Sequence, residues 1–304
     1  MKLAKSLTPS LFFQEELDIL KKQLAAIQEL AARGAMFVVN HSGGKDSQAM
    51  FNFIVRLVPA HQIYVIHATL GLVEWPGVIE HIKATIQDHE LHTCRSRRTL
   101  IEMIKERGMF PSPEMRQCTS DLKRGPIERT IRHEVERRIG AWCGLSNVRS
   151  AAHLHGRTAA LEAGMGLVVN CMGLRAEEST NRAKLQTLKL SVKNSKNGRE
   201  WYDWLPIHHW SADEVFDYIT ACGQVPHYAY ALGMSRLSCA FCIMASKEDL
   251  VVSAKHNHKV FRIYVDLEKE TGHVMMMPSK SKGRLTLEEL TGVTAKTDME
   301  LALL

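Results

Sequence analysis

Apolar and polar stretches alternate along the chain in a pattern that predicts helices placed between buried strands. Leucine and isoleucine recur at helical spacing between residues 13 and 33, which indicates an amphipathic helix that ends at Gly34. The run 35–40 is short and almost wholly apolar, as in a strand buried on both faces. A glycine loop and a helical stretch from residue 46 to about 57 follow. The main fold therefore begins as a strand, a loop and a helix.

Later segments repeat this alternation. We expect strands at 63–67 and 167–171, helices at 76–88, 119–140 and 247–269, and one more helix that opens at the capping box Ser211–Glu214. Alternating strands and helices predict an α/β, Rossmann-like fold with a mainly parallel, doubly wound sheet. The expected parts are an N-terminal helix at 1–33, a main domain at 34–222 and a small, helical, cysteine-containing segment at 223–304.

Composition narrows the class of protein. Of 304 residues, 45% are hydrophobic and 24% are charged, as in globular proteins. No apolar run approaches the roughly 20 residues of a membrane-spanning helix. The first residues make a poor secretory signal, because acidic residues follow a short apolar stretch at once. We therefore expect a soluble, cytoplasmic protein without membrane contact, in which the N-terminal helix packs on the main domain or forms a homodimer.

The basic clusters and the cysteines each allow more than one role. The net charge is +6, and basic residues cluster at Arg95–Arg98 and at 123–138. These clusters indicate either a solvated helix face or a surface for the phosphates of nucleic acid or substrate. The seven cysteines are irregularly spaced, which argues against a disulfide framework and favours free thiols or metal ligands.

The loop Ser42–Ser47, of sequence SGGKDS, carries the clearest chemical signal. Glycines let successive backbone N–H groups converge on an anion, the following helix directs its positive end there, and Lys45 adds a cation. The spacing matches neither a Walker loop nor a dinucleotide fingerprint. A simple tight turn would explain Gly43 and Gly44, but it would leave Lys45, Asp46 and Ser47 without a reason. We therefore predict a site for polyphosphate.

Several ordered motifs extend this signal from about residue 34 to residue 250. They are the SGGKDS loop, His67–Gly71 with Glu74–Pro76, Arg116–Lys123, Gly173–Ser179 with Arg182, Leu205–Ile207 with Trp210, and Ser235–Leu237 before Cys239. Together they resemble the phosphoadenosine phosphosulfate (PAPS) reductase-like branch of the PP-loop ATP pyrophosphatase superfamily, including sulfurtransferases that act in DNA phosphorothioation.

That resemblance implies roles for individual residues. Ser42, Gly43, Gly44 and Ser47 would hold the phosphates of ATP, Lys45 would neutralise them, and Asp46 would support the loop or a magnesium ion. The strand end with His67, Thr69 and Leu70 would line the adenine pocket, with Gly173 beside the nucleotide. Arg175 and Arg182 would bind phosphate or sulfate oxygens. The implied catalytic residues are Lys45, Asp46, Arg175 and Arg182.

Cys239 and Cys242 form a Cys-x-x-Cys motif that could bind a metal, act as a redox pair or have no joint role. The resemblance adds Cys118 and implies that the three cysteines hold a 4Fe-4S cluster, with Cys171, Cys222 or an exogenous sulfide as the fourth ligand. Zinc, with a histidine such as His227, is the alternative, since Cys₃His is an ordinary zinc site.

The resemblance implies adenylation by ATP coupled to sulfur transfer, with a nucleic acid as acceptor and a sulfur-donor protein such as a cysteine desulfurase as partner. A PAPS reductase or the small subunit of an ATP sulfurylase is the alternative within sulfate assimilation. No cysteine follows Cys242, and the intact Lys-Asp of the loop is similar to loops that split ATP. A partner protein that binds nucleotide or nucleic acid without turnover is the alternative from another class.

Overall fold

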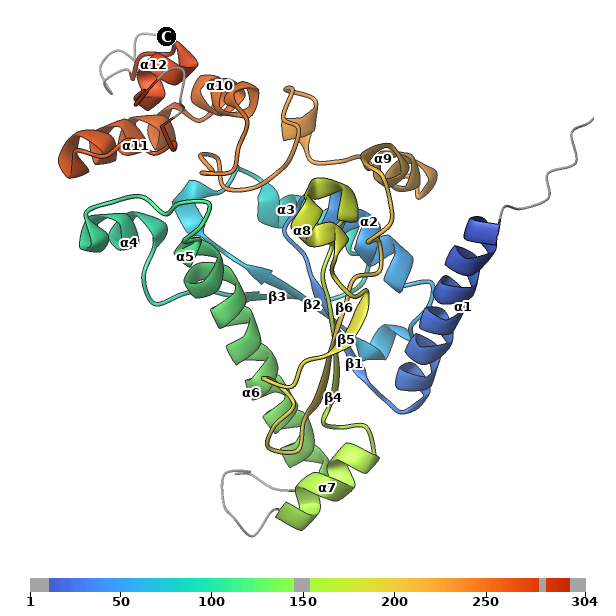
Figure 1. Cartoon of the computed structure of the whole chain (residues 1–304). Helices are drawn as coiled ribbons and strands as arrows, with labels where there is room; N and C mark the ends of the chain where they lie inside the picture. Colours follow the sequence, from blue (N-terminus) through green and yellow to red (C-terminus); the bar gives the residue numbers. More distant parts are fainter. Residues whose placement is uncertain (1–10, 145–153, 279–282, 296–304) are drawn as a thin grey trace, which may run out of the picture.

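A six-stranded sheet runs through the middle of the molecule (Figure 1). The computed structural model describes residues 11–144, 154–278 and 283–295. The strands are β1 (Met36–Asn40), β2 (Ile63–Ala68), β3 (Leu91–Cys94), β4 (Leu167–Cys171), β5 (Leu188–Leu190) and β6 (Glu200–Trp204), in the order β3-β2-β1-β4-β6-β5. All neighbours pair in parallel except β5 and β6, which are antiparallel. The predicted mainly parallel α/β fold is confirmed.

Apolar side chains on both faces explain why β1 lies at the centre. Phe37 and Val39 enter the larger core cluster, whereas Met36 and Val38 enter a second cluster on the opposite face. Successive side chains of a strand point to opposite faces, so an uninterrupted apolar run suits a strand covered by helices on both sides.

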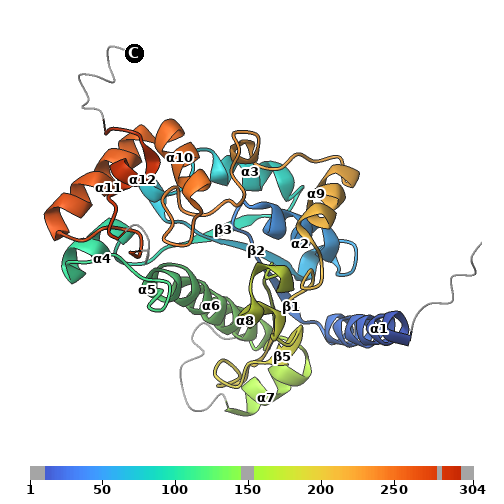
Figure 2. The same ribbon diagram turned by 45° about the horizontal axis from the view of Figure 1, so that its top comes forward.

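Helices cover the two faces of the sheet (Figure 2). Their bounds are α1 (Leu11–Ala32), α2 (Lys45–Ile54), α3 (Val78–Thr85), α4 (Leu100–Arg107), α5 (Gln117–Thr119), α6 (Gly125–Trp142), α7 (Leu154–Glu162), α8 (Thr180–Ala183), α9 (Ala212–Ala221), α10 (Lys247–His256), α11 (His258–Thr271) and α12 (Leu287–Thr291). Helices α2, α3 and α9 contribute to the larger core cluster, and α6 packs on the other face through the second cluster. None of the described helices is both long and apolar enough to cross a membrane.

Chain topology places the SGGKDS loop at a particular point of the sheet. From β1 the chain winds outward through α2, β2, α3 and β3, and it then returns to β4 on the other side of β1. The order of strands reverses direction between β1 and β4. Ligands of open α/β sheets bind at this switch point, beyond the carboxyl ends of the strands. The loop follows the carboxyl end of β1 and so lies there.

Some elements differ from their sequence expectation. The charged helix starts at Gly125, because a π-helical segment, Ser120–Arg124, precedes it. The helical pattern at 247–269 is two helices, since the backbone of Asn257 is not helical (φ −129°, ψ 52°). Strands β3, β5 and β6 and helices α4, α7, α8 and α12 were not predicted. Of the first thirteen residues, which were weighed as a secretory signal, residues 1–10 lie outside the described part of the chain.

Candidate functional site

The loop Ser42–Ser47 is held in shape by its own side chains and by His41. The Ser42 N–H donates to Ser47 Oγ at 3.1 Å, and Ser47 Oγ donates to the Gly44 carbonyl at 2.8 Å. The Gly43 N–H donates to His41 Nδ1 at 3.1 Å, with Gly43 in the left-handed region at φ +79°. Hydrogen bonds within the loop and to His41 therefore fix its conformation.

Backbone amides at the start of α2 remain available for an anion. Among the described residues, the N–H groups of Gly44, Asp46 and Ser47 have no hydrogen-bond acceptor, and that of Lys45 donates to the Tyr230 hydroxyl at 3.0 Å. The first N–H groups of a helix lack partners within the helix and carry the positive end of its dipole. Converging free amides of this kind bind phosphate oxygens.

Neighbouring side chains crowd the positions that Cβ atoms would take on the loop glycines. A Cβ atom on Gly43 would lie 2.9 Å from Val78, and one on Gly44 would lie 3.3 Å from the Tyr230 hydroxyl and 3.5 Å from Leu237. A Cβ atom on Gly173, in the loop after β4, would lie 3.1 Å from the Asp46 carbonyl. Gly173 therefore lies against the loop, backbone to backbone, while its place beside the nucleotide stays a prediction.

Lys45 points into an enclosed space rather than into solvent. Its side chain is 5% exposed, and Nζ lies 3.2 Å from Asp46 Oδ2. The same ammonium lies 5.7 Å from the ring centroids of both Phe216 and Tyr230. Aromatic faces and a carboxylate stabilise a cation that is removed from water. Lys45 is thus held next to the amides of the loop.

Arg175 holds Asp46 from the opposite side. Its Nε donates to Asp46 Oδ1 at 2.6 Å, and its Nη1 donates to Glu177 Oε2 at 2.5 Å and to the Trp210 carbonyl at 3.3 Å. Both oxygens of Asp46 therefore face a cation. Asp46 is therefore engaged by two cations, and these contacts favour a role for Arg175 in positioning the loop.

Arg182 lies further out on α8 and is 25% exposed. It pairs with Glu178, and its carbonyl accepts a hydrogen bond from His208 Nε2 at 2.9 Å. His208 is buried, and its own carbonyl accepts from the Ala176 N–H at 2.7 Å. The segment after β6 therefore fixes the loop that carries both predicted arginines.

His67, Thr69 and Leu70 converge on Glu74. His67 Nε2 lies 3.0 Å from Glu74 Oε1, while Thr69 Oγ1 and the Leu70 N–H donate to Oε2 at 3.1 and 3.0 Å. Burial by itself would raise the pKa of Glu74, but the bonds from His67, Leu70 and Thr69 hold that pKa below its ordinary value. Glu74 is therefore a carboxylate that organises this strand end, which was predicted to line the adenine pocket.

Two imidazoles lie next to the loop, that of His41 buried and that of His81 partly buried. Burial is the main cause that lowers the pKa of His41 to about 3, with smaller effects of His67 and His81. Burial and His227 lower the pKa of His81 to about 4. His41 is therefore neutral at pH 7, so its Nδ1 can accept the Gly43 N–H.

The thiols of Cys118, Cys239 and Cys242 gather around Lys123. Charge on each of the three sulfurs, that of Cys239 most strongly, raises the pKa of the Lys123 ammonium. Burial raises the pKa of Cys239 to about 11, and Lys123 opposes this rise. The Tyr264 hydroxyl lies in the same neighbourhood and is buried without a hydrogen-bond partner among the described residues. Lys123 thus lies among these three thiols, a place that the sequence pattern did not indicate.

The positions of these three thiols can be compared with the predicted cluster and with the zinc site. Within the described ranges, no group of three histidine, cysteine or acidic side chains is close enough to hold a single metal ion. In an iron–sulfur cluster the cysteines bind different irons and need not meet at one ion. The 4Fe-4S cluster and the zinc site therefore both stay predictions.

The other suggested ligands are engaged elsewhere. Cys171 is in the core, and its thiol lies 3.5 Å from the Val169 carbonyl; Cys222 accepts from Arg56 at 3.4 Å. His227 Nε2 donates to the Pro76 carbonyl and its Nδ1 accepts from the Ala229 N–H, both at 3.2 Å. Both ring nitrogens of His227 are used, so it is not free to complete a zinc site.

Tyr230 is the functional candidate that the sequence interpretation missed. Its hydroxyl accepts the N–H of Lys45 in the loop and the N–H of Leu237, two residues before Cys239. No local pattern marks this tyrosine, because both contacts join segments distant in the sequence.

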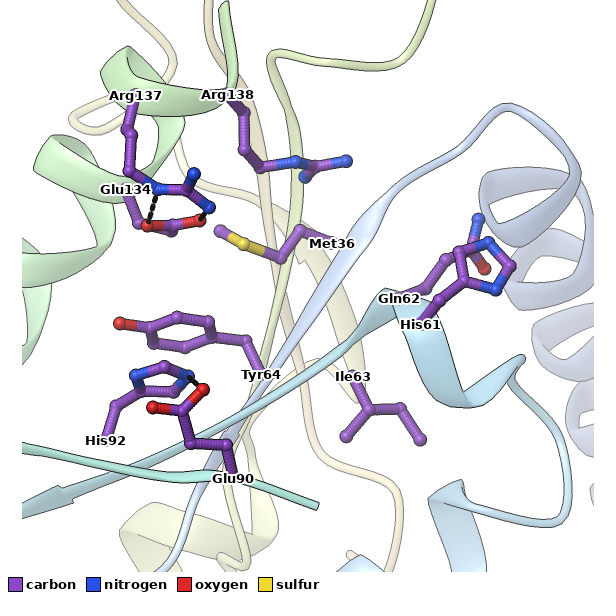
Figure 3. A pocket seen from close by; sticks show the side chains of 10 residues that line it. All are labelled: Met36, His61, Gln62, Ile63, Tyr64, Glu90, His92, Glu134, Arg137 and Arg138. Atoms are coloured by element: carbon purple, nitrogen blue, oxygen red, sulfur yellow. Dashed lines mark hydrogen bonds and ion pairs between the residues drawn. The ribbon is translucent and has the colours of Figure 1, made fainter. Parts of the chain in front are cut away.

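A cavity of about 460 Å³ lies at the other end of the sheet (Figure 3). The beginnings of β1, β2 and β3 and the later half of α6 line it, and the stacked rings of Tyr64 and His92 stand 3.9 Å apart on one side. Arg137 forms two hydrogen bonds with Glu134 there. This cavity is separate from the loop, which follows the carboxyl end of β1.

The chain is similar in sequence to a known protein family and to a phage protein. A family model described as the phosphoadenosine phosphosulfate reductase domain matches residues 36–245. An uncharacterized 37.8 kDa protein of Escherichia phage 186 is 24% identical over 164 residues, and the match covers 54% of this chain but 40% of the phage protein. The chain thus spans less than half of that relative.

Two solved structures have low overall similarity. A PAPS reductase from Candida auris in complex with phosphate has a TM-score of 0.41 at 16% identity, covering 79% of this chain and 97% of that one. A Candida glabrata FMN adenylyltransferase with FAD and pyrophosphate has a TM-score of 0.36 at 10% identity, covering 68% and 55%.

Proposed function

Because the chain belongs to the phosphoadenosine phosphosulfate reductase domain family, whose members are nucleotide-using enzymes of the PP-loop class, we propose that it cleaves ATP to an adenylate and pyrophosphate and couples this cleavage to sulfur transfer. Nucleic acid is the proposed acceptor. A sulfur-donor protein such as a cysteine desulfurase is the proposed partner.

The observation that carries this proposal is the set of free amides at the start of α2. The N–H groups of Gly44, Asp46 and Ser47 have no acceptor among the described residues, and the Lys45 ammonium is held beside them. Preorganised donors of this kind stabilise the charge that develops on phosphate oxygens during transfer. Magnesium would enter bound to the triphosphate, because Asp46 already faces Lys45 and Arg175.

The proposed reaction has two displacements and no net oxidation. An oxygen of the acceptor attacks the α-phosphorus of ATP, the bond from that phosphorus to the bridging oxygen breaks, and pyrophosphate leaves. Hydrosulfide then attacks the activated acceptor atom, whose bond to the adenylated oxygen breaks. AMP leaves with that oxygen, and the proton of hydrosulfide passes to solvent.

The thiols beside Lys123 support the sulfur half of the proposal. A 4Fe-4S cluster held by Cys118, Cys239 and Cys242 would supply a place for sulfide to bind. Lys123 would hold negative charge at the thiols, since charge on all three sulfurs already raises the pKa of its ammonium.

Exposed arginines support a nucleic-acid acceptor. The side chains of Arg95, Arg97 and Arg129 are exposed, and no hydrogen bond or ion pair to them is found in the described part of the chain. Arg98 Nη2 pairs with Asp121 at 2.9 Å, which holds this basic stretch against the segment of Cys118. Unpaired cations near a reactive centre bind a phosphate backbone without sequence preference.

Pyrophosphate release from ATP and magnesium, measured with and without DNA or RNA, tests the first displacement. Lys45→Ala is expected to lower release by at least roughly 100-fold, the usual cost of removing one preorganised donor. Lys189→Ala, on exposed β5, is the matched control and should behave as the wild type. Tight binding of ATP without release under any condition would favour the non-catalytic alternative.

Cys239→Ser tests whether the loop cleaves ATP while the thiols serve the sulfur transfer. We expect this variant to release pyrophosphate as the wild type does but to transfer no sulfur from sodium sulfide to nucleic acid, with Cys143→Ser as the control. Iron and sulfide analysis of anaerobically purified protein checks the cluster independently. Equal loss of both half-reactions in Cys239→Ser would contradict the proposal.

A further inference from the structure

The Tyr230 hydroxyl joins the phosphate loop to the cysteine segment. It accepts the Lys45 N–H at 3.0 Å and the Leu237 N–H at 3.2 Å. The Tyr230 ring packs edge-on against Phe216, with ring centroids 5.4 Å apart. One oxygen atom thus ties together two segments that lie almost two hundred residues apart in the sequence.

The cysteine segment is anchored firmly on either side of Leu237. Ser235 donates through its N–H and its hydroxyl to the two oxygens of buried Asp249, at 2.7 and 2.8 Å. The Ala240 N–H donates to the Val73 carbonyl at 2.8 Å. Between these anchors, Tyr230 is the acceptor for the Leu237 N–H. The Tyr230 hydroxyl is therefore a hydrogen-bonded link between the loop and this stretch, in addition to the packing of Leu237 on the loop glycines.

The Tyr230 hydroxyl still has a proton to donate. Both bonds to it come from N–H groups, and no acceptor for its own proton is found among the residues described. Burial raises the pKa of Tyr230 to about 12, so this proton stays bound at neutral pH. A hydroxyl that already accepts hydrogen bonds is polarised and donates more strongly. It lies beside Gly44, where the free amides of the loop begin.

We propose that the Tyr230 hydroxyl donates a hydrogen bond to a phosphate oxygen of a bound nucleotide and thereby couples occupancy of the loop Ser42–Ser47 to the rigidity of residues 237–242. This inference rests on the proposed function in one respect, namely that the phosphate bound at the loop is that of ATP. When the loop is occupied, Tyr230 is held at three points, and Leu237 with the following Cys239 and Cys242 is held with it. Tyr230 is then a phosphate-binding residue and also the positioning residue for the thiols.

Hydrogen exchange of the backbone amides 237–242, measured by mass spectrometry on the full chain as purified, tests this coupling. A non-hydrolysable ATP analogue with magnesium is expected to slow exchange there roughly tenfold in the wild type. Inorganic pyrophosphate should do the same and adenosine should not, because the contact is with phosphate. Tyr230→Phe keeps the ring but loses the bond to a charged acceptor. Its Kd for the analogue should rise by roughly tenfold or more, and exchange at saturation should not slow.

Two variants control for packing. Tyr228→Phe removes the hydroxyl of a neighbouring, half-exposed tyrosine and should match the wild type. Leu237→Ala removes the side chain that lies over Gly44 but keeps its N–H, so nucleotide should still slow exchange. Thermal melting of each variant checks that it folds.

The outcomes separate this inference from the proposed function. Binding of the analogue without slower exchange at 237–242 overturns the coupling alone. The coupling is also overturned if nucleotide slows exchange at 237–242 equally in Tyr230→Phe and in the wild type. The same holds if nucleotide slows exchange normally in Tyr230→Phe but no longer in Leu237→Ala. A wild type that binds neither analogue nor pyrophosphate overturns both the proposed function and the coupling.

Discussion

The roles of single residues in the site depend on what each side chain contacts. Arg175 and Arg182 occur in one sequence motif, but their surroundings differ. Arg175 is 6% exposed and binds Asp46, Glu177 and a carbonyl, whereas Arg182 is 25% exposed and pairs with Glu178. A buried charge is costly to leave without its partner, and a guanidinium can satisfy several acceptors at once. A substitution of Arg175 should therefore cost more stability than a substitution of Arg182.

Arg175→Lys is expected to weaken both the fold and the loop. An ammonium cannot reach Asp46, Glu177 and the Trp210 carbonyl together, so hydrogen bonds to charged groups worth about 2 kcal/mol are lost. The melting temperature should fall by about 3 °C, and the Kd for ATP should rise. Differential scanning calorimetry and titration calorimetry measure these changes. Arg182→Lys is the matched control, and an equally large effect of both variants would refute the distinction.

At the scale of elements, helix α9 connects the loop after β4 with the phosphate loop. Its capping box is formed as the sequence predicts: the Glu214 N–H donates to Ser211 Oγ at 3.2 Å, and the Ser211 N–H donates to Glu214 at 2.6 Å. The next N–H of the chain, that of Ala212, donates to Glu177, which also binds Arg175. Further along the helix, Phe216 faces the Lys45 ammonium. The start of α9 therefore contributes to the position of Lys45.

Ser211→Ala should cost about 1 kcal/mol of the free energy of unfolding, because one N–H at the helix start loses its acceptor. Thr286→Ala removes the corresponding cap of α12, which lies in the C-terminal part, and serves as the comparison. Urea denaturation should give similar losses for both. Only Ser211→Ala should also raise the Kd for ATP. Unchanged affinity in Ser211→Ala would show that α9 does not contribute to the position of Lys45.

At the scale of the whole molecule, three imidazoles with a lowered pKa lie near one another although they come from segments distant in the sequence. His41 follows β1, His81 lies on α3, and His227 packs against His81 with ring centroids 5.2 Å apart. In the unfolded chain these groups have an ordinary pKa of 6.5, whereas burial lowers the pKa of His41 to about 3 and that of His81 to about 4. Between pH 6.5 and these lower values, the unfolded chain binds protons that the folded chain excludes.

Folding stability should therefore be complete above pH 6.5 and should fall as the pH decreases toward 3. At pH 5, His41 alone contributes a loss of about 2 kcal/mol relative to pH 7. His41→Asn keeps an acceptor for the Gly43 N–H and should reduce this loss, whereas His273→Asn at an exposed position should not. Urea denaturation at pH 7 and pH 5 measures the difference. An identical pH dependence of wild type and His41→Asn would contradict it.

The local sequence determined much of this protein. The apolar run before Asn40, the glycines and the helix that follows specify a strand, an anion-binding turn and a helix start from neighbouring residues. The capping box at Ser211 is of the same kind. These features depend on contacts within a few positions of the chain, so hydrophobic periodicity and turn chemistry are sufficient to predict them.

Only the tertiary structure decided which of the candidate residues meet and what they contact. Asp46 faces Arg175 across 129 positions, and Tyr230 links Lys45 to Leu237. The short strands β5 and β6, and the place of Lys123 among three thiols, were likewise not apparent from the sequence. Such contacts arise when the sheet brings distant loops to one edge, and the pattern of neighbouring residues carries no record of that pairing.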